Sequence, residues 1–218
     1  MKDLFADPDP YDVFVKTFLL PDEVTITLHG MKAENGQTLD STGLTLWKAS
    51  HEMCSFLTCH SNLVKQKTVL ELGAGLGLCG ILCHHLEAAN VVLTDGDTNT
   101  LTNMRNNVTN NITATSRSST LKISCHQLRW GRNLDCFRRQ FGQFDVITAS
   151  DVIYVDEVVE PLLDTVVELL CESGVFLLGF VKRNVRMDYV LECAKDRGMT
   201  WTCPTSDDGE GIFIFRSH

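Results

Sequence analysis

The sequence predicts an α/β fold: a doubly wound, mostly parallel sheet of seven strands with a short N-terminal β extension. Strand-like and helix-like segments alternate from about residue 46 onward, which is typical of βαβ units. The runs over 144–149 and 174–180 are apolar on both faces, as strands of a parallel sheet covered by helices are. The apolar run ending at Leu72 leads into glycines at 73, 75 and 77 and then into a helical pattern. That layout predicts strand, tight turn and helix, with bare backbone facing a ligand.

The elements follow in chain order. Strand-like segments over 11–20 and 24–29 are split by Pro21-Asp22-Glu23, and apolar residues alternate with polar ones in the second segment, the period of a half-buried strand. A polar, turn-rich stretch over 31–43 precedes a helical pattern over 46–63. Further strands are expected near 68–72, 91–94, 121–125, 144–149, 174–181, 199–203 and 211–215, and further helices near 77–87, 97–109, 155–171 and 185–197. The glycines around residue 210 predict a turn into a last, antiparallel strand. We therefore divide the chain into a β extension over 1–45 and one domain over 46–218.

Composition narrows the class of protein. The net charge of −9 and pI near 5.2 disfavour binding to nucleic-acid phosphates, so no nucleic-acid partner is expected. This charge suits a cationic substrate, although solubility alone would also explain it. No apolar run approaches the roughly 18 residues of a membrane-spanning helix, so no membrane association is expected.

The cysteines indicate a compartment. Nine are scattered without a CxxC pair, which favours reduced thiols in the cytoplasm, with the nucleus as a second location. The same spacing leads us to expect no metal site, because structural zinc needs four converging ligands. Two matches to the glycosylation sequon, at Asn107 and Asn111, matter only in a secreted protein and are treated as chance.

The glycine turn allows two cofactor readings. The spacing Gly75-x-Gly77-x-x-Gly80 matches a dinucleotide fingerprint, but its first glycine comes late after the strand. The earlier glycines directly follow the strand and carry Glu71 just before them. An acid there suits a cofactor with a cationic amino-acid end, such as S-adenosylmethionine, and would repel a pyrophosphate. A nicotinamide-linked oxidoreductase and a purely structural turn remain alternatives.

Asp95 is a candidate for the ribose of such a cofactor. It closes the apolar run over 91–94 and lies 20 residues after Gly75, about the distance to the next strand end. Its carboxylate would accept charge-assisted hydrogen bonds from two ribose hydroxyls. Asp95 could instead cap the following helix, but Asp97 could do that itself.

Asp151 and Tyr154 are candidates for the reacting end of the site. They follow the apolar strand over 146–149, and ligands of open α/β sheets bind beyond the carboxyl ends of strands. An acid and a phenol three residues apart can face one pocket there. Alternatively, Asp151 caps the next helix and Tyr154 packs beneath it.

The order of five short motifs carries a family resemblance. They are Leu46-Trp47-Lys48-Ala49-Ser50, Glu71-Leu72-Gly73-Ala74-Gly75-Leu76-Gly77-Leu78, Thr94-Asp95, Leu128-Arg129-Trp130-Gly131 and Asp151-Val152-Ile153-Tyr154. Together they resemble class I seven-β-strand protein-lysine methyltransferases of the methyltransferase-like 21 type. The resemblance runs from about residue 46 to 154 and implies a Rossmann-like methyltransferase sheet. It also implies S-adenosylmethionine as cofactor and a protein lysine as methyl acceptor.

The resemblance also implies roles for individual residues. Trp47 would help to close the cofactor pocket, and Trp130, which could otherwise be a core residue, would lie against the adenine. Asp95 would hold the ribose, Ser150 would line the floor, and Asp151 with Tyr154 would form the methyl-transfer mouth. The residues expected at the methionine end are Glu71, Gly73, Ala74 and Gly75.

The acceptor stays open within the resemblance. A chaperone-like or translation-factor-like protein is expected as substrate of a monomeric enzyme. A protein histidine or a small molecule remains an alternative acceptor, because fold does not fix substrate.

Overall fold

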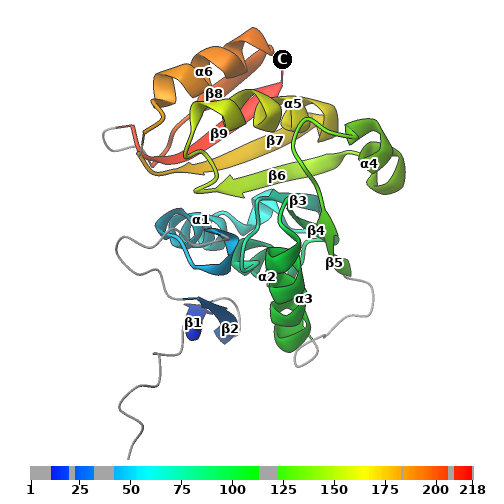
Figure 1. The fold of residues 1–218 in the computed structure, drawn as a ribbon, viewed down its shortest axis with the longest axis vertical. Helices are drawn as coiled ribbons and strands as arrows, with labels where there is room; N and C mark the ends of the chain where they lie inside the picture. Colours follow the sequence, from blue (N-terminus) through cyan, green and yellow to red (C-terminus); the bar gives the residue numbers. More distant parts are fainter. Residues whose placement is uncertain are drawn as a thin grey trace, which may run out of the picture.

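The computed structural model describes residues 11–19, 23–31, 42–112, 122–182, 184–205 and 209–217. Its strands are β1 (Tyr11–Leu19), β2 (Glu23–Met31), β3 (Thr68–Leu72), β4 (Asn90–Asp95), β5 (Lys122–Gln127), β6 (Phe144–Ser150), β7 (Leu170–Phe180), β8 (Met199–Thr202) and β9 (Gly211–Ser217). Its α-helices are α1 (Lys48–Cys59), α2 (Leu78–His85), α3 (Thr98–Ile112), α4 (Leu134–Phe141), α5 (Val159–Leu169) and α6 (Met187–Asp196). Three short 3-10 helices complete the list: η1 (Thr42–Leu44), η2 (Ser61–Leu63) and η3 (Asp156–Val158). Figure 1 shows how these elements are arranged.

The main sheet has seven strands in the order β5-β4-β3-β6-β7-β9-β8. The first five of these strands run parallel, and β9 is antiparallel to both of its neighbours. The predicted fold class is therefore confirmed, including the antiparallel last strand. The chain steps outward from β3 to β5 and then returns to pair β6 on the other side of β3. Ligands of open α/β sheets bind at such a reversal of strand order.

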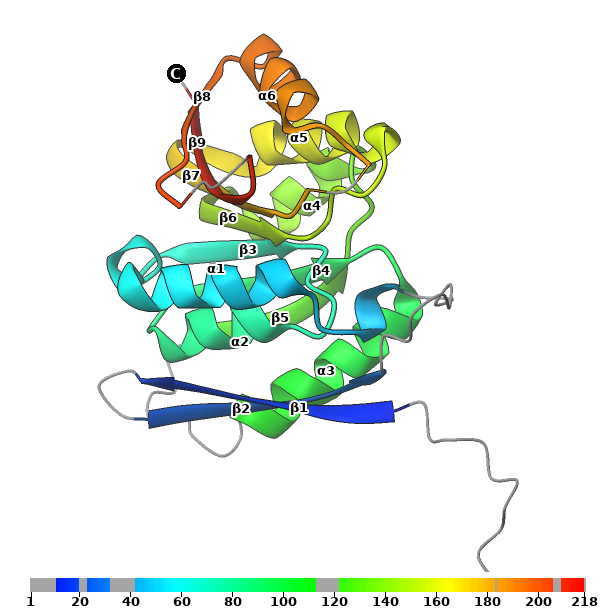
Figure 2. The same ribbon diagram turned by 90° about the vertical axis from the view of Figure 1, so that its left-hand side faces the viewer.

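Helices cover both faces of the sheet, with α4, α5 and α6 on one side and α1, α2 and α3 on the other (Figures 1 and 2). Side chains of a strand alternate between faces. Accordingly, Leu70 and Leu72 of β3 join the buried cluster under the first set of helices, and Val69 joins the cluster under the second. Glu71 alternates to the same face as Val69, which brings an acid into an apolar layer.

The N-terminal extension forms a separate two-stranded antiparallel sheet, β1–β2, with Tyr11 opposite Met31 and Leu19 opposite Glu23. It lies alongside α3 (Figure 2), with Ile26 and Leu28 of β2 fully buried. The predicted extension is thus present. The boundary between residues 45 and 46 remains a prediction, and most of the polar stretch over 31–43 lies outside the described residues.

Two expectations for the elements were wrong. Helix α4 was not predicted, although Leu134, Phe137 and Phe141 share one face of a short, otherwise polar helix. The helix predicted over 155–171 is shorter, because η3 precedes it and β7 already begins at Leu170. The apolar run from Leu169 to Cys171 fits either element, so periodicity alone could not place the boundary.

No helix among the described residues is long and apolar enough to cross a membrane. No group of three His, Cys, Asp or Glu side chains in those ranges could hold a metal ion.

Candidate active site

A cavity of about 630 Å³ lies at the carboxyl ends of the central strands, where the strand order reverses. Its volume is in the range of roughly 300–1,000 Å³ that small-molecule sites occupy. All ten predicted site residues line this one cavity: Trp47, Glu71, Gly73, Ala74, Gly75, Asp95, Trp130, Ser150, Asp151 and Tyr154. The structure therefore brings together residues that are spread over more than 100 positions of the sequence.

The glycine turn forms the backbone-lined part of the cavity. Gly73, Gly75 and Gly77 have positive φ angles of 63°, 54° and 88°, which L side chains rarely adopt. The turn is held by hydrogen bonds from the N–H of Gly77 to the Ala74 carbonyl (2.8 Å) and from the N–H of Ala74 to the Thr94 carbonyl (2.9 Å). A Cβ on Gly73 would lie 2.7 Å from Cγ1 of Val152 and 3.3 Å from Cζ2 of Trp130. Only glycine leaves this cradle open, which fits close approach of a ligand to the backbone.

Asp95 joins the glycine turn to the start of α3. Its Oδ2 accepts a hydrogen bond from the N–H of Gly75 (3.2 Å), and its Oδ1 accepts one from the N–H of Asp97 (3.0 Å). Each carboxylate oxygen can accept a further hydrogen bond, so Asp95 can still accept hydrogen bonds from ribose hydroxyls. Burial raises the pKa of Asp95, while its backbone donors act in the opposite direction.

Asp97, not Asp95, caps α3. Its Oδ1 accepts from the N–H of Asn99 (3.0 Å) and its Oδ2 from the Thr100 hydroxyl (3.1 Å). The capping alternative for Asp95 therefore does not apply, and Asp95 is available to face the cavity.

Glu71 is a buried acid at the base of the turn, with 2% of its surface exposed. Its Oε2 accepts a hydrogen bond from the N–H of Gly80 (2.8 Å). Burial raises the pKa of Glu71 to about 8, and the Gly80 bond only partly offsets this. Without a cation beside it, the Glu71 carboxyl is therefore mostly protonated at neutral pH.

Glu71 should make stability depend on pH, in a direction opposite to that of an ion-paired acid. Between its unfolded pKa near 4.5 and its folded pKa near 8, the folded protein binds one more proton than the unfolded chain. The free energy of unfolding should therefore fall as pH rises through this window, by up to about 1.4 kcal/mol per pH unit. In Glu71→Gln this pH-dependent contribution should vanish. The free energy of unfolding of the variant relative to that of wild type, measured in urea, should therefore increase from pH 5 to pH 8. A constant difference between the two proteins would contradict the assignment.

The floor of the cavity is polar and close-packed. The hydroxyl of Ser150 lies 3.3 Å from that of Ser50 and 3.9 Å from Sγ of Cys79. Ser150 thus lines the cavity and contacts both α1 and α2.

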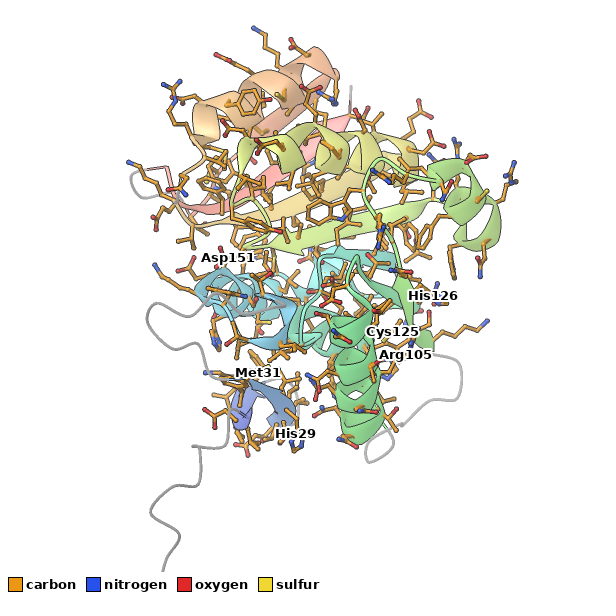
Figure 3. All side chains as sticks on the ribbon, viewed as in Figure 1. His29, Met31, Arg105, Cys125, His126 and Asp151 are labelled. Atoms are coloured by element: carbon orange, nitrogen blue, oxygen red, sulfur yellow. The ribbon has the colours of Figure 1, made fainter. Side chains whose placement is uncertain are left out.

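The mouth of the cavity is formed after β6. Asp151 lies at the end of this strand (Figure 3) and has a φ of +59°, in the left-handed region that few residues other than glycine, Asn and Asp adopt. Its N–H donates to the Gly179 carbonyl of β7 (2.9 Å), which helps to hold this conformation. Tyr154 is 46% exposed. Asp151 does not cap the next helix, because Val158 occupies the cap position of α5, and the exposure of Tyr154 contradicts burial beneath that helix.

One wall of the cavity was missed by sequence reasoning. It comes from the segment that follows the N-terminal extension: Thr42, Gly43, Thr45 and Leu46, beside the predicted Trp47. The indole N–H of Trp47 donates to the Thr42 carbonyl (2.9 Å), and a Cβ on Gly75 would lie 3.1 Å from the Gly43 carbonyl oxygen. Apart from Leu46, which belongs to the first motif, nothing in the local sequence signals this wall, because it depends on how the extension returns to the sheet.

The other lining residues that were not predicted lie beside predicted ones, on α1 or at the mouth: Ser50, Leu76, Leu78, Gly96, Asp97, Leu128, Arg129, Val152, Glu157, Val158 and Pro161. Adjacency to the motifs could have identified most of them. The last three come from η3 and the start of α5, which no motif marked.

Comparisons with known proteins identify the family of this chain. The family described as "Lysine methyltransferase" matches residues 29–196, from β2 to the end of α6. The protein N-lysine methyltransferase METTL21A of Danio rerio is 33% identical over 175 residues, covering 80% of this chain and 77% of the relative. METTL21A of Xenopus tropicalis is also 33% identical, over 69% of this chain and 66% of the relative.

Two solved structures share the fold. The ribosomal protein L11 methylase of Lactobacillus delbrueckii subsp. bulgaricus has a TM-score of 0.62 at 19% identity, covering 85% of this chain and 92% of that one. SMU.776, complexed with SAH, has a TM-score of 0.64 at 12% identity, covering 97% of this chain and 57% of that one. The family match spans well over half of the sequence and includes every predicted site residue. The chain therefore belongs to the lysine methyltransferase family and is an S-adenosylmethionine-dependent protein-lysine methyltransferase.

Proposed function

We propose that this cavity holds S-adenosylmethionine against the glycine turn and receives the acceptor lysine between Asp151 and Tyr154. The observation that supports the proposal is that one cavity is lined both by the open cradle at Gly73 and by the acid and phenol that follow β6. The donor set fits the cofactor: Asp95 for the ribose, Trp130 for the adenine and Glu71 beside the cationic methionine end. The bound cofactor supplies an electrophilic methyl group on a sulfonium.

The residues of the chain would act mainly by positioning. Asp151 attracts the incoming ammonium, and the Tyr154 hydroxyl orients the amine along the line of attack. A lysine amine has an ordinary pKa near about 10.4 and must lose a proton before it attacks. Loss of water around the amine disfavours its charged form, so no strong base is required.

The acceptor that we propose is a chaperone-like or translation-factor-like protein, encountered by a monomeric enzyme in the cytoplasm and, second, in the nucleus. All nine cysteines are free, which supports a reducing compartment. The family resemblance supports the acceptor class.

A labelling experiment tests the acceptor. Purified enzyme, S-adenosylmethionine with a labelled methyl group and a cell lysate should yield a labelled protein whose label maps to lysine by mass spectrometry. Label confined to histidine or to small molecules would overturn this part of the proposal.

In the same preparation, S-adenosylmethionine and S-adenosylhomocysteine should raise Tm, whereas NAD should not.

A further inference from the structure

Two buried asparagines on α3 hydrogen-bond to the backbone of strand β2. Asn107 and Asn111 are 0% and 8% exposed, although helix interiors rarely bury amide side chains. They are four residues apart and therefore lie on one face of the helix. A buried amide must find hydrogen-bond partners, and both find them on strand β2.

The two amides bind the backbone of β2 as another strand would. Oδ1 of Asn107 accepts from the N–H of His29 (2.9 Å), and its Nδ2 donates to the His29 carbonyl (3.1 Å). Asn111 makes the same pair of bonds with Thr27, at 2.9 and 2.8 Å. Four residues of helix rise about 6.0 Å and two residues of strand about 6.8 Å, so the two spacings match. Figure 3 shows His29 on β2 beside α3.

The two asparagines differ in where their remaining donor goes. The second N–H of the Asn111 amide stays within its own helix, donating to the Asn107 carbonyl (2.7 Å). The second N–H of Asn107 donates to the carbonyl of Leu76 (3.1 Å). Leu76 lies between two glycines of the cofactor turn and lines the cavity. Asn107 therefore joins the N-terminal sheet to the cofactor turn through its bonds to His29 and Leu76.

A second contact strengthens this connection. A Cβ on Gly30 would lie 2.8 Å from Cδ1 of Leu76 and 2.7 Å from the Leu44 carbonyl oxygen. Strand β2 is thus in close contact with Leu76 of the glycine turn and with Leu44 of η1, the 3-10 helix at the start of the wall that includes Gly43.

We propose that Asn107 is a positioning residue for the cofactor: it fixes the glycine turn through Leu76 and links docking of the β1–β2 sheet to cofactor binding. The inference rests on the proposed place of S-adenosylmethionine against that turn. Because linkage is reciprocal, a bound cofactor stabilises the docked sheet, and a docked sheet strengthens cofactor binding.

The matched pair Asn107→Ala and Asn111→Ala tests the inference. Each variant loses one pair of bonds to β2, to His29 for Asn107→Ala and to Thr27 for Asn111→Ala, and the two should lose similar amounts of Tm. Only Asn107→Ala leaves the Leu76 carbonyl without its partner, so its Kd and KM for S-adenosylmethionine should rise about tenfold. Asn111→Ala keeps the Asn107 bonds to His29 and Leu76, so the sheet stays docked against the turn and Kd should stay within about twofold of wild type. The kcat at saturating cofactor should be similar in all three proteins. Equal shifts in Kd for both variants, or none in Asn107→Ala, would overturn the inference.

Hydrogen exchange of the unmodified protein provides a test that survives a folding defect. Saturating S-adenosylhomocysteine should slow exchange of the Thr27 and His29 amides as well as those of the glycine turn. Protection confined to the turn would refute the linkage. If the wild-type protein shows no binding of either S-adenosyl compound, the proposed function itself fails, which is a different result.

Discussion

Asp151→Asn is expected to lower kcat by about a thousandfold while the Kd for S-adenosylhomocysteine stays within about threefold of wild type. The substitution removes the negative charge that would hold the acceptor ammonium at the mouth of the cavity, and positioning of this kind has effects of such size. Asparagine is the right replacement because it tolerates the left-handed backbone that Asp151 adopts. Calorimetry with S-adenosylhomocysteine and a methyl-transfer assay separate the two quantities.

Two further variants control this experiment. Asp151→Gly keeps the positive φ without strain and removes the whole side chain, so it should be as inactive as Asp151→Asn. Asp156→Asn removes an exposed carboxylate from η3 that does not line the cavity, and it should leave kcat near wild type. Asp151→Asn with more than a tenth of wild-type kcat would exclude Asp151 from the reaction.

The cofactor half of the site can be predicted from sequence because its residues lie next to strand ends. Glycines that directly follow an apolar run, and an acid that closes the next run, indicate both their structure and their place at one edge of the sheet. The topology then brings Asp95 and Asp151 together without any further information. The resemblance of the motif order added Trp47, Trp130 and Ser150, whose residue types alone point as readily to a core.

The N-terminal contribution could not be predicted because it depends on contacts distant in sequence. Asn107 and Asn111 stand in sequon triplets that were treated as chance, yet they bind β2 about 80 residues earlier in the chain. The wall that includes Gly43 depends on the same docking. The raised pKa of Glu71 is a consequence of burial, which the pattern of β3 allows but does not quantify.

Gly73→Ala should weaken binding of S-adenosylhomocysteine at least about a hundredfold and lower the free energy of unfolding by about 2 kcal/mol or more. A left-handed backbone costs an L residue roughly 1–2 kcal/mol. In addition, the new methyl group would lie 2.7 Å from Val152 and 3.3 Å from Trp130. Either these two side chains must move or the methyl group must occupy the space beside the turn. The two effects differ in origin: the first acts on stability alone, whereas the second also removes space that a ligand would use.

Gly198→Ala separates these effects. Gly198 has a comparable φ of +71°, but nothing lies within 4 Å of a Cβ placed there. This variant should lose stability by about the backbone cost alone and should bind S-adenosylhomocysteine as wild type does. The difference between the two variants in Kd then measures the filled cradle, independently of backbone strain. If Gly73→Ala were destabilised like Gly198→Ala yet bound the ligand within threefold of wild type, the methionine end would not lie against this turn, and the proposed placement of the cofactor would be wrong.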